Sequence, residues 1–349
     1  MFIRIVFIFF VNLNCMLFAY DYDFDINNVE SIPLEKKISQ MLLVGFSGSE
    51  FSEELISYIK TYNIGGVVYF NKSFSRLKKT NILSYKQIID LNKDIQNNSS
   101  IPSFIGIADD VSLPSNLEMD LNYSFSYLFS DKINDIYDES LKIAKKLKHL
   151  GFNLDINNNI SNSIVDYSVF YKNISKYLNA YKEVQIMKSI NYTYSIHNTK
   201  PSSSFTDISQ YELLEEEAKI NFFHKNIINS IILPNAINNN IDSKYPASLS
   251  TDFINKLKTT LEYQGLIITS DLKNRSMSLN YSLDEALIMA INSGSNIIFY
   301  SNNVGKYNAE FVKNAISIIK QNVINGNIDI QKINDSYIKI LQIKKQLKI

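Results

Sequence analysis

The chain has 349 residues, of which 45% are hydrophobic and 20% are charged, so it can bury a large core and is not disordered over most of its length. Lysine plus arginine and aspartate plus glutamate each number 35, which leaves no basic field for a phosphate backbone and argues against a nucleic-acid partner. The length exceeds an ordinary single core but suits one large α/β barrel.

The first predicted element is a secretory signal peptide. One early cation, Arg4, precedes a short apolar run, and a small residue, Ala19, stands before the acidic stretch YDYDFD. Cleavage near Ala19 would export the mature protein. The predicted organisation is a signal peptide over residues 1–19, a lead-in over residues 20–30 and one barrel domain over residues 31–349.

Two alternatives to cleavage stay open for this segment. Asn12 and Asn14 interrupt the apolar run and shorten it below a comfortable membrane span, which disfavours an uncleaved anchor. The chain's only cysteine, Cys15, would be a lipidated first residue in the other alternative, although Asn14 is bulky for such processing. Cleavage leaves a mature chain without a thiol, a disulfide or a cysteine metal ligand. We expect a periplasmic protein with no stable transmembrane segment.

Eight short apolar runs recur along the rest of the chain, separated by amphipathic stretches. Such runs, without strict polar alternation, are typical of parallel strands that are buried on both faces. Eight of them predict a closed barrel. The runs cover residues 41–46, 64–70, 103–108, 151–156, 184–190, 230–235, 265–271 and 296–302.

Helices are predicted between these strands. The stretch ISYIKTYNIGG is expected to end at Gly65 and Gly66 with a left-handed cap, and ESLKIAKKLKHLGF is expected to end at Gly151. The carboxyl-terminal segment predicts two helices broken at Gly326. The inner faces are predicted to hold Ile143, Leu147 and Leu150 in the earlier helix and Ile333, Tyr337, Ile340 and Leu341 in the last.

Alternating strands and helices predict a single (β/α)8 TIM-type barrel of the α/β class. In that fold the chemistry is found at the carboxyl-terminal ends of the strands. The long polar segment at 191–207 follows the fifth strand, so it is either an active-site loop or an ordinary surface loop. No glycine-rich phosphate loop, His/Cys metal spacing or G-x-S-x-G elbow occurs in the sequence, and no cofactor is expected.

Several stretches resemble glycoside hydrolase family 3, in particular its single-domain bacterial β-N-acetylglucosaminidases. The opening LEKKISQMLLVGF, the run IGGVVYF, the block DSKYPASLSTDFINKLKTTLEYQGLIITSDL and the ending ALIMAINSGSNIIFYSNN carry the resemblance, which spans residues 31–345. The most specific pieces are the stretch YPASLS at 245–250 and the strand GLIITSD. These pieces form largely structural parts of the barrel, and function depends on the residues at the strand ends.

The resemblance implies sugar-binding carboxylates after the third and fourth strands. The family has D-x-E-G-G after the third, where this chain has IADDVS, and Asp109 replaces the missing aspartate only by a one-residue slip. The family has A-P-V-x-D after the fourth, where residues 157–161 read NNNIS. Asp109 is therefore a substrate-binding candidate, and the second carboxylate is absent.

The fifth and sixth strand ends also depart from the family's motifs. The family's K-H-F-P-G-H-G reads KSINYTY here, so that only Lys188 is retained, either for sugar binding or for an ordinary ion pair. The family's D-x-H acid/base motif is missing, which leaves His197, without a carboxylate nearby in sequence, as the one histidine candidate. At the sixth strand the family's M-V-A-H reads ILPN, which makes Asn235 a substrate-binding candidate.

The seventh strand decides between an enzyme and a silent relative. Family members place the nucleophilic aspartate directly after a threonine or serine, and alignment on Thr269 and Leu272 puts Ser270 at that position, with Asp271 next to it. A retaining glycosidase needs a carboxylate there. Because successive strand residues point to opposite sides, Asp271 can replace it only if the strand end is bulged.

Three readings follow from these strand ends. The favoured one is a catalytically degenerate relative of the β-N-acetylhexosaminidases that binds cell-wall glycan or another envelope protein. The second is an active, divergent β-N-acetylglucosaminidase with Asp271 as nucleophile, Lys188 on the substrate and an acid elsewhere, such as Asp207 or Glu212. The third is an unrelated barrel enzyme that shares only the block at 242–272.

Overall fold

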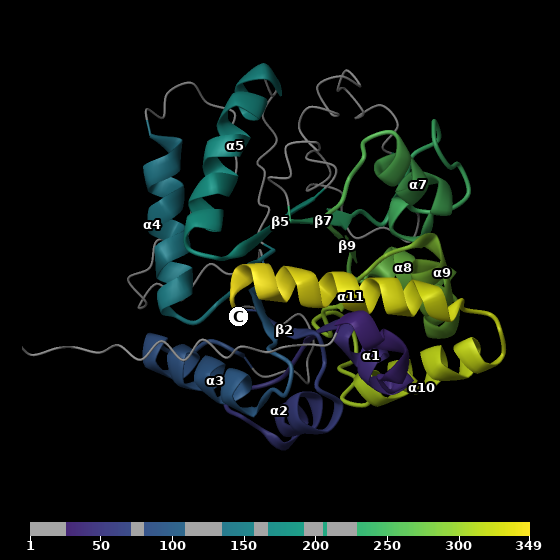
Figure 1. The fold of residues 1–349 in the computed structure, drawn as a ribbon, viewed down its shortest axis with the longest axis horizontal. Helices are drawn as coiled ribbons and strands as arrows, with labels where there is room; N and C mark the ends of the chain where they lie inside the picture. Colours follow the sequence, from purple (N-terminus) through teal and green to yellow (C-terminus); the bar gives the residue numbers. More distant parts are fainter. Residues whose placement is uncertain (1–25, 71–79, 109–134, 157–166, 192–204, 208–228) are drawn as a thin grey trace, which may run out of the picture.

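The computed structural model describes residues 26–70, 80–108, 135–156, 167–191, 205–207 and 229–349. Its centre is a ring of parallel strands in the order β10-β1-β2-β3-β4-β5-β7-β9 (Figure 1). All the pairings in this sheet are parallel, as expected for strands covered by helices on the outside. The strands are β1 (Leu42–Gly45), β2 (Gly66–Tyr69), β3 (Phe104–Ile107), β4 (Leu154–Asp155), β5 (Met187–Asn191), β7 (Ser230–Leu233), β9 (Leu266–Thr269) and β10 (Ile298–Tyr300).

The two ends of this sheet, β9 and β10, approach each other and nearly close the barrel. Ile268 and Ile297 form a parallel bridge, and the main-chain N–H of Thr269 donates to the carbonyl of Ile297 at 3.0 Å. Seven of the eight strands lie within a predicted apolar run, and the eighth, β5, extends one residue beyond its run at 184–190. The prediction of a (β/α)8 barrel is therefore confirmed.

Helices surround the ring, and most of them bury an apolar stripe against it (Figure 1). Two short strands, β6 (Thr206–Asp207) and β8 (Ala236–Ile237), form a separate parallel pair that the sequence did not predict. The helices are α1 (Leu34–Gln40), α2 (Glu53–Ile56), α3 (Tyr85–Asn98), α4 (Ile136–His149), α5 (Tyr167–Glu183), α7 (Thr251–Thr259), α8 (Arg275–Asn280), α9 (Leu283–Ser293), α10 (Phe311–Ile324) and α11 (Ile330–Leu347), with helical turns η1 (Ile26–Ser31), η2 (Ser57–Tyr62) and η5 (Ala247–Leu249).

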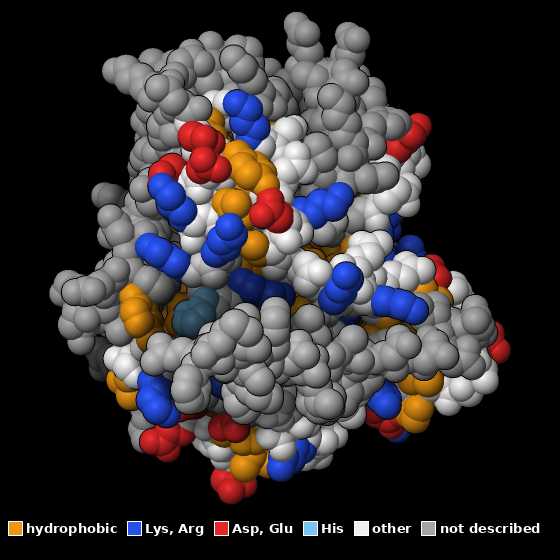
Figure 2. Space-filling view, turned by 60° about the vertical axis from the view of Figure 1, so that its left-hand side comes forward, with side chains coloured by type: hydrophobic (Ala, Val, Ile, Leu, Met, Phe, Trp, Pro, Cys, Tyr) orange, Lys and Arg blue, Asp and Glu red, His pale blue; other side chains and the backbone are white. Residues whose placement is uncertain are grey.

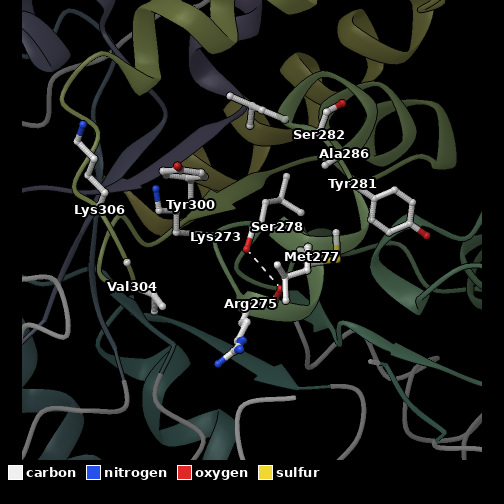
Figure 3. Close-up of a pocket in the computed structure, with 14 residues that line it drawn as sticks. Lys273, Arg275, Met277, Ser278, Tyr281, Ser282, Ala286, Tyr300, Val304 and Lys306 are labelled. Carbon is white, nitrogen blue, oxygen red and sulfur yellow. Dashed lines mark hydrogen bonds between the residues drawn. The ribbon is translucent and has the colours of Figure 1, made fainter. Parts of the chain in front are cut away.

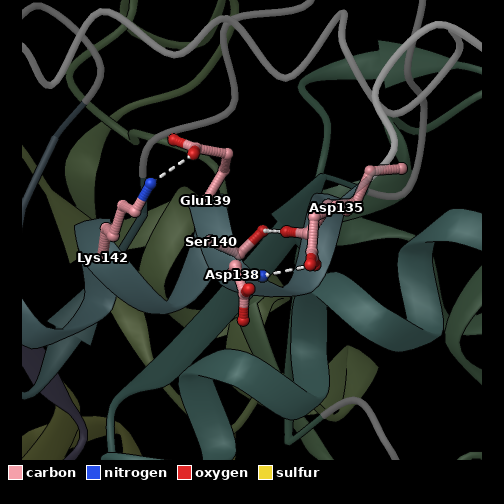
Figure 4. Close-up of polar contacts among 6 residues, drawn as sticks. Asp135, Asp138, Glu139, Ser140 and Lys142 are labelled. Carbon is pink, nitrogen blue, oxygen red and sulfur yellow. Dashed lines mark hydrogen bonds and ion pairs between the residues drawn. The ribbon is translucent and has the colours of Figure 1, made fainter.

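Helix α4 illustrates how local sequence sets these boundaries. The Asp135 carboxylate accepts the main-chain N–H of Asp138 at 3.0 Å and caps the first turn, where Glu139 pairs with Lys142 (Figure 4). Gly151, with φ of +88°, takes the left-handed conformation just after the helix, as predicted. The predicted inner faces of α4 and α11 and the break at Gly326, with φ of +78°, are also confirmed.

The predicted glycine cap at Gly65 and Gly66 is wrong. The preceding helical segment ends at η2, and Asn63, with φ of +47°, takes the left-handed position. The two glycines serve close packing instead, since an added Cβ would lie 2.0 Å from the Gln40 carbonyl oxygen at Gly65 and 2.4 Å from the Phe104 carbonyl oxygen at Gly66. The local pattern correctly predicted a left-handed turn after this helix, but the turn is at Asn63 and not at the glycines.

Helix α11 lies across the amino-terminal ends of the strands (Figure 1). The Lys344 ammonium, fully buried, donates to Gln40 Oε1 at 2.8 Å and to the Gly65 carbonyl at 2.9 Å, and these residues precede β1 and β2. Tyr337 packs on Ile101, which precedes β3. Burial lowers the pKa of Lys344 well below its usual range. The end of the barrel left for a site is therefore the carboxyl-terminal one.

The surface carries charges of both signs. On the face that includes α4 and α5, acidic and basic side chains are interspersed among apolar ones (Figure 2). This agrees with the equal counts of acidic and basic residues in the chain. Within the described ranges, no helix combines the length and the apolar character needed to cross a membrane.

Candidate active site at the carboxyl-terminal strand ends

Asp271 lies two residues beyond the end of β9, on the rim of the barrel. Its carboxylate accepts three hydrogen bonds: from the main-chain N–H of Ser301 at 2.8 Å, from the Ser301 hydroxyl at 2.6 Å and from the main-chain N–H of Lys273 at 3.0 Å. Ser301 follows β10, so the carboxylate connects the two strands that close the barrel. Burial raises the pKa of the Asp271 carboxyl, and the bonds from Ser301 and Lys273 oppose this rise.

The end of β9 is bulged. Thr269 and Leu272, three residues apart, donate their main-chain N–H groups to Ile297 and Phe299, which are two residues apart. One strand therefore holds one residue more than its neighbour over this stretch, which is the definition of a β-bulge. Strict alternation of side chains ends here. Asp271 can replace the nucleophile only if the strand end is bulged, and the backbone has this bulge.

Ser270 occupies the position that the family alignment gives to the nucleophile. Its main-chain N–H donates to the Leu233 carbonyl at 2.9 Å, which holds it against β7, and its side chain is half-buried. Within the part of the chain that the structure describes, no base is bonded to its hydroxyl. A serine without a base is neither anionic nor activated, so it cannot replace a carboxylate at an oxocarbenium centre.

Asn235, at the end of β7, is held by two hydrogen bonds. Its amide nitrogen donates to the Asp271 carbonyl at 2.8 Å, and its amide oxygen accepts the Ser248 hydroxyl at 2.6 Å. Ser248 belongs to the stretch YPASLS, which carried part of the resemblance. Asn235 thus connects β7 to the rim at β9, and its predicted role in substrate binding stays a prediction.

Lys188 is buried and paired with Asp155. The distance from Lys188 Nζ to Asp155 Oδ1 is 3.1 Å, and the two side chains are 1% and 4% exposed. The ammonium also lies 5.9 Å from the ring centroid of Tyr181 on α5, which places it on the side of β5 that this helix covers. Of the two roles that the sequence left open for Lys188, the contacts favour the ion pair.

The remaining candidates are spread more widely. Asp207 on β6 is exposed, and its carboxylate accepts the amide of Asn239 at 2.6 Å. Asp109, His197, Glu212, Cys15 and the signal peptide lie outside the described residues. Within the described ranges, no group of three or more His, Cys, Asp or Glu side chains is arranged to hold a metal ion.

Sequence reasoning missed Ser301 and Asp155. Ser301 is the last residue but one of the predicted eighth strand, and its role depends on a contact with a residue 30 positions earlier, which no local pattern shows. Asp155 had a visible signal, because an aspartate inside the apolar run GFNLDI needs a partner when both faces of the strand are covered.

A nearly closed ring of eight parallel strands, with helices outside it and polar side chains at the carboxyl ends of its strands, defines a (β/α)8 barrel whose site is expected at that end. Residues 201–343 match the model of the glycosyl hydrolase family 3 N terminal domain. The resemblance to family 3 predicted from the sequence is thereby confirmed. No curated protein matches the chain.

Solved structures extend the likeness in fold to most of the chain. A glycoside hydrolase family 3 β-N-acetylglucosaminidase from Paenibacillus sp. str. FPU-7 superposes with a TM-score of 0.75 at 19% identity, over 91% of this chain and 63% of that one. A β-N-acetylglucosaminidase from Thermotoga maritima gives 0.67 at 16% identity, over 89% and 67%. A glycosyl hydrolase family 3 member from Mycobacterium smegmatis str. MC2 155 gives 0.72 at 13% identity, over 90% and 98%. This chain spans less than two thirds of the Paenibacillus enzyme.

Proposed function

We propose that this protein is a catalytically silent relative of the family 3 β-N-acetylglucosaminidases, exported to the periplasm, whose barrel binds cell-wall glycan or another envelope protein. The observation that carries the proposal is the use of Asp271. It is the carboxylate nearest to the nucleophile position in sequence, and three hydrogen bonds from Ser301 and Lys273 tie it to the rim.

The chemistry of a retaining glycosidase supports this proposal. Such an enzyme needs an ionised carboxylate that attacks the anomeric carbon and a second group that protonates the leaving oxygen. Burial raises the pKa of Asp271, which opposes ionisation, and its oxygens already accept the bonds from Ser301. Ser270 supplies neither charge nor a base at the aligned position.

The ion pair of Lys188 supports the same proposal. A lysine that holds sugar hydroxyls must present its ammonium group to the barrel mouth. The Lys188 side chain is 1% exposed, and its ammonium group lies near both the Asp155 carboxylate and the Tyr181 ring. These contacts support a packing role between β4, β5 and α5 for the residue retained from the family's fifth-strand motif.

One observation favours the alternative, an active β-N-acetylglucosaminidase that uses Asp271. The bulge between Thr269 and Leu272 frees Asp271 from strict strand alternation, so its side chain is not confined to one side of the strand. This alternative requires that the Asp271 carboxylate give up its hydrogen bonds from Ser301 and contact the sugar when substrate binds. It also requires an acid from another strand end.

Release of a chromophore from an aryl β-N-acetylglucosaminide tests the two functions. The mature protein is compared with Asp271→Asn and with Asp252→Asn, a matched control at an exposed position in the first turn of α7. We expect no release above background from any of the three, while the Thermotoga maritima β-N-acetylglucosaminidase serves as positive control. Turnover that Asp271→Asn abolishes and Asp252→Asn retains would establish the enzyme and refute the proposal.

Binding and export need measurements of their own. Co-sedimentation with purified peptidoglycan tests the glycan partner, and cross-linking in intact cells followed by mass spectrometry tests the protein partner. Failure of both would remove the proposed binding role. The amino terminus of the protein isolated from cells tests export, since cleavage after Ala19 is expected and an intact Met1 would contradict it.

A further inference from the structure

A pocket of about 540 Å³ opens beside the barrel rim, between the loops that follow β9 and β10 (Figure 3). Its walls come from the segment after β9, helix α8, the start of α9 and the segment after β10. The volume falls in the range of pockets that hold small organic molecules. The pocket lies next to Asp271 in sequence, but Asp271, Ser270 and Asn235 do not line it.

The walls of this pocket are largely apolar. Leu279 and Val304, which are 59% and 38% exposed, stand at its edge and are two of the few large apolar side chains left open to solvent in the described part of the chain. Tyr281 and Tyr300 add aromatic surfaces on opposite sides of the pocket (Figure 3). Exposed apolar groups gathered around a cavity are typical of a binding site rather than of an ordinary surface.

The charged side chains of the pocket all have one sign. Lys273, Arg275 and Lys306 line it, and the residues described in its walls include no aspartate or glutamate. Lys273 Nζ lies 5.3 Å from the ring centroid of Tyr300. Arg275 and Lys306 are exposed, and their side chains make no ion pair or hydrogen bond with any residue that the structure describes.

Two carboxylates adjacent in sequence to residues of the pocket wall accept hydrogen bonds from other groups. Asp271 accepts the bonds from Ser301, and Glu285 caps α9 by accepting the main-chain N–H of Ser282 at 2.8 Å. Neither carboxylate lines the pocket, although the charge of Lys273 acts on the Asp271 carboxyl and opposes the rise in its pKa that burial causes. Three cations therefore line an apolar cavity, and no carboxylate of the described residues lines it with them.

The position of the pocket agrees with a general property of the fold. In (β/α)8 barrels the loops after the seventh and eighth strands often form a phosphate-binding site, and β9 and β10 are the seventh and eighth strands of this ring in chain order. We propose that this pocket binds a phosphate monoester with an apolar or aromatic body. The phosphate pairs with Lys273, Arg275 and Lys306, and the body lies against Leu279, Val304 and the two tyrosine rings. This proposal goes beyond the function proposed above and does not depend on it.

Isothermal titration with 2-naphthyl phosphate tests both halves of this ligand. Inorganic phosphate presents the anion alone, and 2-naphthol presents the body alone. We expect the ester to bind at least about tenfold more tightly than either part, because each part keeps only one of the two kinds of contact. Vesicles of phosphatidylcholine with and without phosphatidic acid distinguish a free ester from a lipid headgroup as the source.

Two variants and one control locate the binding. Arg275→Gln and Lys306→Gln remove one cation each at exposed positions, so they leave the core intact, and each is expected to weaken the ester about tenfold. Lys345→Gln makes the same change in charge at an exposed position of α11, at the opposite end of the barrel, and should leave binding unchanged.

Each outcome decides the proposal. Binding of the soluble ester identifies a free phosphate ester, and binding only to vesicles with phosphatidic acid identifies a lipid phosphate; both support it when Arg275→Gln and Lys306→Gln weaken the interaction and Lys345→Gln does not. Equal binding of 2-naphthol and the ester, equal losses in all three variants, or no binding in either arm would overturn it.

Discussion

The buried pair of Lys188 and Asp155 gives the sharpest prediction about how the strand ends are used. At 3.1 Å the attraction between the two charges is about 5 kcal/mol at an effective dielectric constant of about 20. Burial costs several kcal/mol for each ion, so the intact pair contributes little net stability. Replacing one partner removes the attraction and leaves the cost of the other charge.

The test is a double-mutant cycle. Lys188→Met and Asp155→Leu are each expected to lower the free energy of unfolding by about 3–5 kcal/mol, whereas the double variant is expected to lie close to the wild type, because both charges of this pair are then removed together. Urea unfolding followed by circular dichroism and by tyrosine fluorescence measures these changes, and agreement between the two probes supports a two-state treatment.

A control and a refutation complete this experiment. Lys142→Met breaks the surface pair with Glu139 and should change the free energy of unfolding by at most about 1 kcal/mol. If the losses of Lys188→Met and Asp155→Leu simply add in the double variant, the two charges are not coupled and the reasoning fails. If Lys188→Met leaves stability unchanged but abolishes peptidoglycan binding, Lys188 is a ligand-binding residue instead.

Three further expectations follow from single contacts. Ser250→Ala removes both the cap of α7 and the bond to Asp242, and should cost about 1–3 kcal/mol by urea unfolding, while an unchanged midpoint would contradict that role. Gly45→Ala would put a Cβ 1.7 Å from the Ser301 carbonyl oxygen, so we expect at least about 3 kcal/mol of destabilisation or no soluble protein; a normal melting temperature would contradict the packing. The pKa of Lys344 is lowered in the folded protein, so between that lowered pKa and about 10.4 only the unfolded chain keeps the proton, and the free energy of unfolding should rise with pH. Lys344→Met should remove this part of the pH dependence, and a variant with the same dependence as the wild type would refute the role of Lys344.

The strands were predictable from the sequence because strands buried on both faces need uninterrupted apolar runs. Helix ends were predictable where one residue carries the signal, as at Gly151 and Gly326. The cap at Gly65 was mispredicted because a pattern cannot distinguish a glycine needed for φ from one needed for close approach to Gln40. That distinction depends on a neighbour 25 positions away in the chain.

The position of the candidate site was predictable from the sequence, but the contacts that its residues make were not. Ser270 and Asp271 were located at a strand end, and the structure adds the bulge and the bonds from Ser301, which depend on pairing with β10. The sequence left two roles open for Lys188, an ion pair and a sugar contact, because a lysine at this strand end is compatible with both. Only the location of Asp155 in the neighbouring strand separates them.

The polar residues at the strand ends connect neighbouring strands in their order around the ring. Asp155 and Lys188 join β4 to β5, Asn235 joins β7 to the rim at β9, and Asp271 with Ser301 joins β9 to β10. In an enzyme, catalytic groups are held at a cost to stability, so replacing one often leaves the fold as stable or more so. In a silent scaffold the same positions stabilise the ring. Asp271→Asn keeps one acceptor oxygen for the two main-chain N–H groups but puts an amide N–H₂ opposite the Ser301 hydroxyl, which loses its charged acceptor. This change should lower the free energy of unfolding by about 1–3 kcal/mol, whereas a gain in stability would favour a catalytic Asp271.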